Sequence, residues 1–117
     1  MLSPSVRMTL KWSVLPGEAR SITAALQGAM VLTRNEPGCL GCSMTTDMGA
    51  KVVINYTEDW ATEADLQRQL RSEGFCVLAE LLERANEPPV IEFALNDSVR
   101  GLDYAQEVRA RRPRAGY

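Results

Sequence analysis

Histidine is absent from this sequence of 117 residues. Its absence removes the most common general base, the Ser–His and Cys–His nucleophile pairs, and the imidazole ligands that most catalytic zinc and haem sites use. Any chemistry in this protein must therefore proceed without imidazole. We expect neither a metal site nor a bound cofactor.

Long hydrophobic runs are also missing. No segment approaches the ~20 apolar residues that a membrane span needs, and Met1-Leu2-Ser3-Pro4 lacks the basic-then-apolar pattern of a secretory signal. We therefore expect a cytoplasmic protein with no membrane partner. At this length the chain is expected to form one domain, which buries roughly two-thirds of its unfolded surface and has little room for a separate cofactor-binding lobe.

Basic charge is scarce over most of the chain. Residues 1–99 carry 8 basic and 13 acidic side chains, whereas residues 100–117 carry 5 and 2. An acidic body repels phosphate backbones, so nucleic-acid binding would depend on the tail from Arg109 to Arg114, where no aromatic residue is interleaved. We interpret this tail as a solvated terminus and expect no nucleic-acid partner.

Two kinds of hydrophobic periodicity divide the first half of the chain. Residues 6–15 alternate between apolar and polar side chains, which is typical of a half-buried strand. From about residue 18 the apolar positions are spaced three and four apart, which predicts a helix that ends at Asn35-Glu36-Pro37-Gly38. Two extended stretches follow, at residues 39–47 and 51–60, and the short glycine-containing link between them suits a hairpin.

The second half repeats the pattern. Thr62, with Asp65 three residues later, predicts a helix start, and the helical face is interrupted at Gly74 before it resumes. This pattern predicts two short helices or one kinked helix that ends near Asn86. Residues 90–96 supply a fourth strand. The order βαββαβ predicts an α+β, ferredoxin-like domain over residues 1–97, with an antiparallel four-stranded sheet and helices on one face. We assign residues 98–117 to a C-terminal arm with a basic tail.

The uncovered sheet face and the arm both suggest a partner. Trp12 on the first strand, and Ile54, Tyr56 and Trp60 on the third, would form an exposed hydrophobic patch if the helices left them uncovered. Pairing two sheets through the open face as a homodimer would bury this patch and enclose a small cavity. Residues 102–108 predict a short helix, and we expect its apolar side to pack across the partner.

Three short motifs resemble one family. Glu36-Pro37-Gly38-Cys39-Leu40 precedes and enters the second strand, Asp47 ends it, and Glu58-Asp59-Trp60 closes the third. Over residues 6–96 the chain resembles the antibiotic biosynthesis monooxygenase family of small dimeric α/β barrels. The resemblance implies a quinol or polyketide-anthrone monooxygenase that uses molecular oxygen without metal or flavin. Other relatives degrade haem, but that branch implies a histidine ligand to iron, which this chain lacks.

The second helix departs from the family pattern. Many members carry H-x-x-S-x-H-F, whereas this chain reads Gln69-Leu70-Arg71-Ser72-Glu73-Gly74-Phe75. Both histidines are replaced, by Gln69 and Gly74. A glutamine donates and accepts hydrogen bonds but does not exchange a proton near neutral pH, so this helix is expected to orient a substrate and not to supply acid–base catalysis.

The third strand carries the candidate site. Glu58 is the one carboxylate that we nominate as a catalytic base, with Tyr56 and Trp60 as an aromatic wall; alternatively, Trp60 is core and Glu58 an internal hydrogen-bond acceptor. The function hypotheses are cofactor-free oxidation of a small phenol or quinol, or non-catalytic binding of a small aromatic ligand, for example in a stress-related protein. The predicted substrate-binding residues are Trp60, Tyr56, Trp12, Met44, Asn55, Gln69 and Phe75.

Cys39-Leu40-Gly41-Cys42 has the spacing of a redox or zinc motif. Residues three apart on a regular strand point to opposite faces, and no helix N-terminus is predicted beside either thiol. Cys76 as a third ligand would leave zinc one ligand short. We therefore expect three free, mostly buried thiols.

Overall fold

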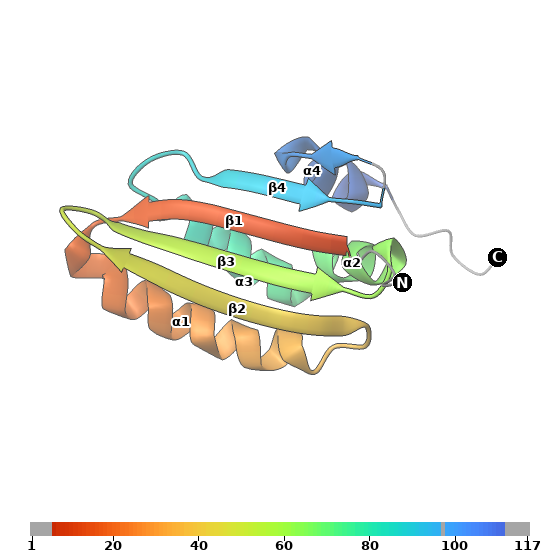
Figure 1. Ribbon diagram of the computed structural model, residues 1–117, viewed down its shortest axis with the longest axis horizontal. Helices are drawn as coiled ribbons and strands as arrows, with labels where there is room; N and C mark the ends of the chain where they lie inside the picture. Colours follow the sequence, from red (N-terminus) through yellow and green to blue (C-terminus); the bar gives the residue numbers. More distant parts are fainter. Residues whose placement is uncertain (1–5, 97, 112–117) are drawn as a thin grey trace.

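The computed structural model describes residues 6–96 and 98–111, and its centre is an antiparallel sheet with helices on one face (Figure 1). The strand order is β2-β3-β1-β4-β5. The elements are β1 (Val6–Val14), α1 (Pro16–Arg34), β2 (Cys39–Met48), β3 (Val52–Trp60), α2 (Glu63–Leu70), α3 (Glu73–Glu83), β4 (Val90–Ala94), β5 (Val99–Arg100) and α4 (Leu102–Ala110). The α+β, ferredoxin-like prediction is confirmed, with a short fifth strand that the sequence analysis did not include.

The core lies between the sheet and the helices. On β1 the alternate residues Val6, Met8, Leu10, Trp12 and Val14 are all buried, as the alternation predicted. Their cross-strand partners on β3 are equally buried, because the antiparallel register places Val6 opposite Trp60 and Val14 opposite Val52. On the helix side, the core is completed by the buried α1 residues Ile22, Leu26 and Met30.

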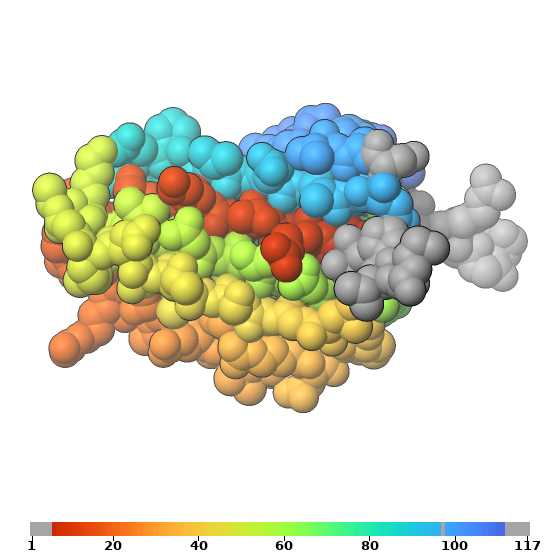
Figure 2. Space-filling model, viewed as in Figure 1, coloured from red at the N-terminus to blue at the C-terminus, as the bar shows by residue number. Residues whose placement is uncertain are grey.

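The uncovered face of the sheet is mostly polar, and Figure 2 views the molecule from this side. Thr9 of β1 lies opposite Thr57 of β3, which lies opposite Ser43 of β2. The prediction of an exposed hydrophobic patch on this face is therefore wrong. The residues expected to form it, Trp12, Ile54, Tyr56 and Trp60, share one face of the sheet, and that face is the one covered by helices.

Two capped helices form here, which is one of the two predicted alternatives, but the break between them does not lie at Gly74. Thr62 caps α2, since its hydroxyl accepts a hydrogen bond from the Asp65 backbone N–H at 3.1 Å. Ser72 caps α3 in the same way through the Phe75 N–H at 3.3 Å. The break therefore lies at Arg71 and Ser72, and Gly74 belongs to α3.

Gly38 connects α1 to β2 with a backbone that only glycine adopts easily. Its φ is +85°, in the left-handed region, and an added Cβ would lie 2.2 Å from the Asp65 carboxyl carbon. The Gly38 carbonyl accepts a hydrogen bond from the Ala61 N–H at 2.8 Å. This turn therefore ties the start of β2 to the segment between β3 and α2.

The C-terminal arm packs on its own chain. Tyr104, Ala105 and Val108 of α4 are buried within one copy, and the Tyr104 ring lies 5.1 Å from that of Phe93. The expectation that this side packs across a partner is therefore wrong, because α2 and β4 of the same chain cover it. The domain boundary at residue 97 stays a prediction, and residues 112–117 of the basic tail lie outside the described residues.

Across residues 6–96 and 98–111, none of the helices has the length and apolar character needed to cross a membrane.

Candidate functional site

A buried carboxylate lies near the end of β3 on the helix-covered face. Glu58 is 1% exposed. Its Oε1 accepts a hydrogen bond from Trp60 Nε1 at 3.0 Å, and its Oε2 accepts one from the Tyr56 hydroxyl. The three side chains meet because alternate residues of a strand share a face. Burial raises the pKa of the Glu58 carboxyl, and the two hydrogen bonds oppose this shift.

A thiol extends this group of hydrogen bonds toward the edge of the sheet. Cys42 Sγ lies 3.2 Å from the Tyr56 hydroxyl oxygen. Burial raises the pKa of the Cys42 thiol to about 11, so the thiol is protonated at neutral pH and donates to Tyr56. Burial also raises the pKa of the Tyr56 hydroxyl well above its usual value. We call Cys42, Tyr56, Glu58 and Trp60 the Glu58 array.

A β-bulge places both cysteines of the CxxC motif on one face. Cys39 pairs with Trp60 and Cys42 pairs with Glu58, and the register shifts between Cys39 and Gly41. Because Trp60 and Glu58 are two residues apart on one face, their partners also share that face, and the expectation of opposite faces is wrong. All three thiols are free, as predicted, but only Cys42 is fully buried, whereas Cys39 and Cys76 are partly exposed.

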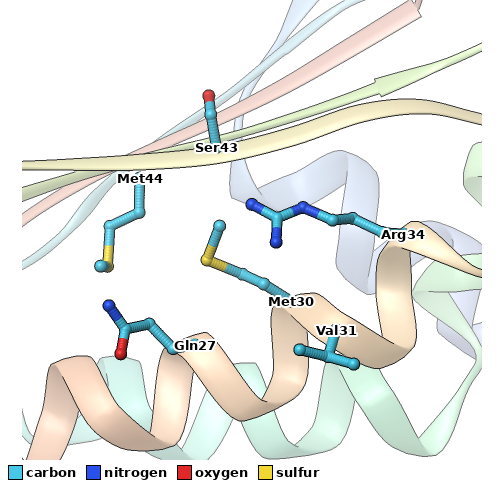
Figure 3. A pocket seen from close by; sticks show the side chains of 6 residues that line it. All are labelled: Gln27, Met30, Val31, Arg34, Ser43 and Met44. Carbon is cyan, nitrogen blue, oxygen red and sulfur yellow. The ribbon is translucent and has the colours of Figure 1, made fainter.

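A pocket of about 410 Å³ lies beside the array, between α1 and the edge strand β2. Figure 3 shows Gln27, Met30 and Arg34 of α1 extending toward β2, and Met44 extending back toward α1. Arg34 donates to the Cys42 carbonyl from Nε at 3.2 Å and from Nη2 at 2.9 Å. We call this the α1–β2 pocket; its lining residues are Gln27, Met30, Val31, Arg34, Ser43 and Met44.

The α1–β2 pocket is one layer of side chains from the Glu58 array. Met44 is the cross-strand partner of Tyr56. Cys42 connects the two sites, since its thiol contacts Tyr56 and its carbonyl accepts from Arg34, which lines the pocket. The residues that link the pocket to the Glu58 carboxyl are therefore Met44, Cys42 and Tyr56.

A second pocket, of about 360 Å³, contains the positions where the family pattern has histidines. It lies between the end of α1 and the junction of α2 with α3, and Gln69, Gly74 and Thr33 line it. Gln69 is 6% exposed, and its Nε2 lies 3.5 Å from Thr33 Oγ1. A Cβ at position 74 would lie 3.4 Å from Gln69 Nε2. This pocket presents amide and hydroxyl groups, and the expectation that this helix orients a substrate stays a prediction.

The remaining predicted residues lie elsewhere. Trp12 lines a hollow near Lys11 and Lys51, and Phe75 lines an apolar hollow between α3 and the C-terminal segments. Asn55 lies on the uncovered face, opposite Lys11. The structure thus brings together Tyr56, Glu58 and Trp60, with Met44 adjacent, whereas Trp12, Asn55, Gln69 and Phe75 do not join them in one cavity.

Arg34 and Gln27 are the lining residues that the sequence analysis did not nominate. One signal was available for Arg34. It ends α1, and only four residues separate it from the start of β2, so the last turn of the helix must lie near the start of that strand. The edge position of β2, which leaves the Cys42 carbonyl within reach of this arginine, depends on the strand order and not on any local motif.

No cluster of three or more acidic or thiol side chains that could hold a metal ion occurs in the described part of the chain. The expectation that the protein has no bound cofactor stays a prediction.

Comparisons with known proteins agree with this fold. A conserved protein from Methanosarcina mazei Go1 is 19% identical, with a TM-score of 0.70 over 80% of this chain and 93% of that one. The protein PA3566 from Pseudomonas aeruginosa is 20% identical, with a TM-score of 0.66 over 84% and 99%. A structure described as an antibiotic biosynthesis monooxygenase is 17% identical, with a TM-score of 0.65 over 81% and 99%.

No curated protein matches the sequence. The family model described as antibiotic biosynthesis monooxygenase matches residues 5–81, which include β1, α1, β2, β3, α2 and most of α3. This match covers more than half of the chain and includes the Glu58 array, the α1–β2 pocket and the pocket at Gln69. The chain therefore belongs to the antibiotic biosynthesis monooxygenase family.

Proposed function

We propose that this protein is a cofactor-independent monooxygenase that oxidises a small phenol- or quinol-type aromatic with molecular oxygen. Membership of the family supports a monooxygenase-like function in general. The observation that carries the finer proposal is the Glu58 array, a buried carboxylate connected through a phenol and a thiol to the wall of the α1–β2 pocket.

The reaction makes modest demands on the protein. It needs a water-poor pocket, an electron-rich ring, and help in removing one proton so that the substrate anion can pass an electron to oxygen. For an anthrone, a CH2 group becomes C=O. One atom of O2 enters this carbonyl, and the other leaves as water with the two hydrogens of the substrate. The substrate supplies all four electrons, so no external reductant is required.

The chain's own groups divide these tasks. Glu58 is the proposed acceptor for the substrate proton: the Cys42 thiol takes up the substrate proton and passes its own to the Tyr56 hydroxyl, which passes its own to Glu58. Trp60 is 1% exposed and donates to Glu58, so it holds the carboxylate in place. We place the aromatic ring of the substrate against Met44, the neighbour of Tyr56, in the α1–β2 pocket.

A second candidate function is non-catalytic binding of a small aromatic ligand. Both oxygens of Glu58 already accept hydrogen bonds from within the protein, which is the arrangement expected of a structural carboxylate. Gln69 and Gly74 also replace the histidines of the family pattern. On this view the fold keeps its pockets and has lost proton transfer.

Oxygen uptake by the purified protein tests the two candidates. A panel of anthrones, naphthoquinols and catechols is assayed with the wild type, with Glu58→Gln, and with Glu80→Gln as a matched change of an exposed carboxylate. The monooxygenase predicts uptake that follows protein concentration, is lost in Glu58→Gln and is kept in Glu80→Gln. Tight binding without uptake supports the ligand-binding candidate, and equal uptake by both variants excludes Glu58 as the base.

We further propose a homodimer that forms through the uncovered sheet face, as in the dimeric α/β barrels of the family. This face is polar, so the interface depends on hydrogen bonds around Thr57 and Asn55 more than on a hydrophobic patch. Thr57→Arg places two like charges near the centre of such an interface. Light scattering after size-exclusion chromatography should show a dimer for the wild type and a monomer for the variant; a monomeric wild type refutes the proposal.

A further inference from the structure

Arg34 brings a positive charge without an acidic partner to the α1–β2 pocket. Arg7, Arg68, Arg84 and Arg100 each lie 2.7 to 3.0 Å from a carboxylate oxygen. Within residues 6–96 and 98–111, Arg34 forms no such ion pair, and its recorded hydrogen bonds go to the Cys42 carbonyl. A carbonyl orients a guanidinium but does not neutralise it, so the pocket carries a net positive charge at this wall.

The carbonyl also leaves donors of Arg34 available. A guanidinium has five N–H donors in a fixed plane, and this one uses Nε and Nη2 on Cys42. Nη1 has no hydrogen-bond partner among the described residues. Because two donors are already held in place, the remaining ones are oriented before a ligand arrives, which lowers the entropy that binding must overcome.

The rest of the pocket suits an aromatic ring. The thioethers of Met30 and Met44 extend into the space between α1 and β2, and the Gln27 amide lies at its other end from Arg34 (Figure 3). Methionine sulfur makes favourable contacts with aromatic rings and adapts to their shape. Met30 is 4% exposed, so its position is fixed by the core.

We propose that the α1–β2 pocket binds a small aromatic anion, with its ring between Met30 and Met44 and its phenolate or carboxylate oxygen on the Arg34 guanidinium. This inference rests on the proposed function and deepens it, because it specifies the charge of the ligand. A fixed cation favours the phenolate over the phenol, and the phenolate is the form that passes an electron to oxygen. Arg34 would thus assist deprotonation in a chain that has no histidine.

Binding of probes that the protein does not oxidise tests this proposal. Calorimetry without oxygen compares 2-naphthoate with its neutral counterpart 2-naphthamide, using the wild type, Arg34→Gln, Arg34→Lys and Arg20→Gln. Arg20 is the matched control, since it is an exposed arginine on the same helix, 14 residues or about 21 Å away. Thermal melting confirms that each variant is folded.

We expect the wild type to prefer 2-naphthoate, and Arg34→Gln to weaken its binding roughly tenfold with little effect on 2-naphthamide. Arg34→Lys keeps part of the preference, and Arg20→Gln keeps all of it. Equal affinity of the wild type for the two probes overturns the proposal, as does equal weakening by Arg34→Gln and Arg20→Gln.

A second experiment tests whether the pocket also binds a phenolate and not only a carboxylate. The absorbance of 2-naphthol reports its ionisation, so its apparent pKa is measured with and without protein. The wild type should lower this pKa and Arg34→Gln should not; an unchanged pKa with bound naphthol excludes a phenolate role. Neither experiment depends on oxygen uptake. Charge-dependent binding without uptake contradicts only the monooxygenase, whereas uptake with Arg34→Gln unchanged in affinity and in kcat/KM contradicts only this inference.

Discussion

Replacing Gly38 by alanine tests the turn that joins the family motif to α2. The change adds a Cβ at a φ of +85°, where a non-glycine residue costs about 1 to 2 kcal/mol. The added atom would also lie 2.2 Å from both Cγ and Oδ2 of Asp65, far inside van der Waals contact. Relieving such an overlap in packed structure costs about 1 to 3 kcal/mol. We therefore expect a loss of about 2 to 5 kcal/mol in the free energy of unfolding.

The matched control is Gly28→Ala, in the middle of α1. An added Cβ there meets nothing within 4 Å, so only the intrinsic helix preference changes, and we expect stabilisation of about 0.5 to 1 kcal/mol. Urea denaturation monitored by circular dichroism measures both variants. The reasoning is refuted if Gly38→Ala loses less than about 0.5 kcal/mol, or if the two variants lose stability equally.

Three further predictions concern buried groups. Burial in the folded state raises the pKa of Glu58 above its unfolded-state pKa of about 4.3. Protonation of Glu58 therefore stabilises the fold: this stabilisation is fully present below the unfolded-state pKa and is lost as the pH rises through the folded-state pKa. Wild-type stability should thus fall relative to Glu58→Gln as the pH rises above the unfolded pKa, and parallel pH curves from urea titrations would contradict this. Tyr104→Phe removes hydrogen bonds to Glu63 at 2.7 Å and Gln67 at 3.1 Å, so we expect a loss of about 1 kcal/mol; an unchanged melting temperature would argue against these bonds. Val108→Ala should cost about 2 kcal/mol at any protein concentration, since α4 packs on its own chain, whereas a cost that varies with concentration would indicate packing across a partner.

Local patterns predicted most of the fold. The alternation in residues 6–15 identified β1 and its buried face, and the side chains of Thr62 and Asp65 identified the start of α2. The predicted break at Gly74 was wrong because a glycine inside a helix is tolerated. The residue that starts α3 is Ser72, whose hydroxyl caps the helix. β5 has only two residues, too few to show an alternation of apolar and polar side chains in the sequence.

The features of the site that could not be predicted from the sequence depend on pairing between strands that are distant in the chain. The prediction that Tyr56, Glu58 and Trp60 share a face needs only strand periodicity, and the structure agrees. Which sheet face the helices cover, however, cannot be read from β3 alone. The bulge between Cys39 and Gly41 changes the direction of the Cys39 side chain. A glycine inside a strand is compatible with a bulge but does not require one, so Gly41 alone does not predict it. The α1–β2 pocket depends on β2 being an edge strand, which follows from the strand order.

The contact between Arg34 and Cys42 also bears on how these molecules avoid aggregation. An edge strand presents unpaired carbonyl and N–H groups that can recruit a strand from another molecule. On β2 one such carbonyl, that of Cys42, is already occupied by a charged side chain, and the bulge beside Cys39 interrupts the regular spacing of the edge. The residue that we propose as a ligand contact thus also protects the edge, and Arg34 variants should form more high-molecular-weight species on prolonged incubation than Arg20 variants.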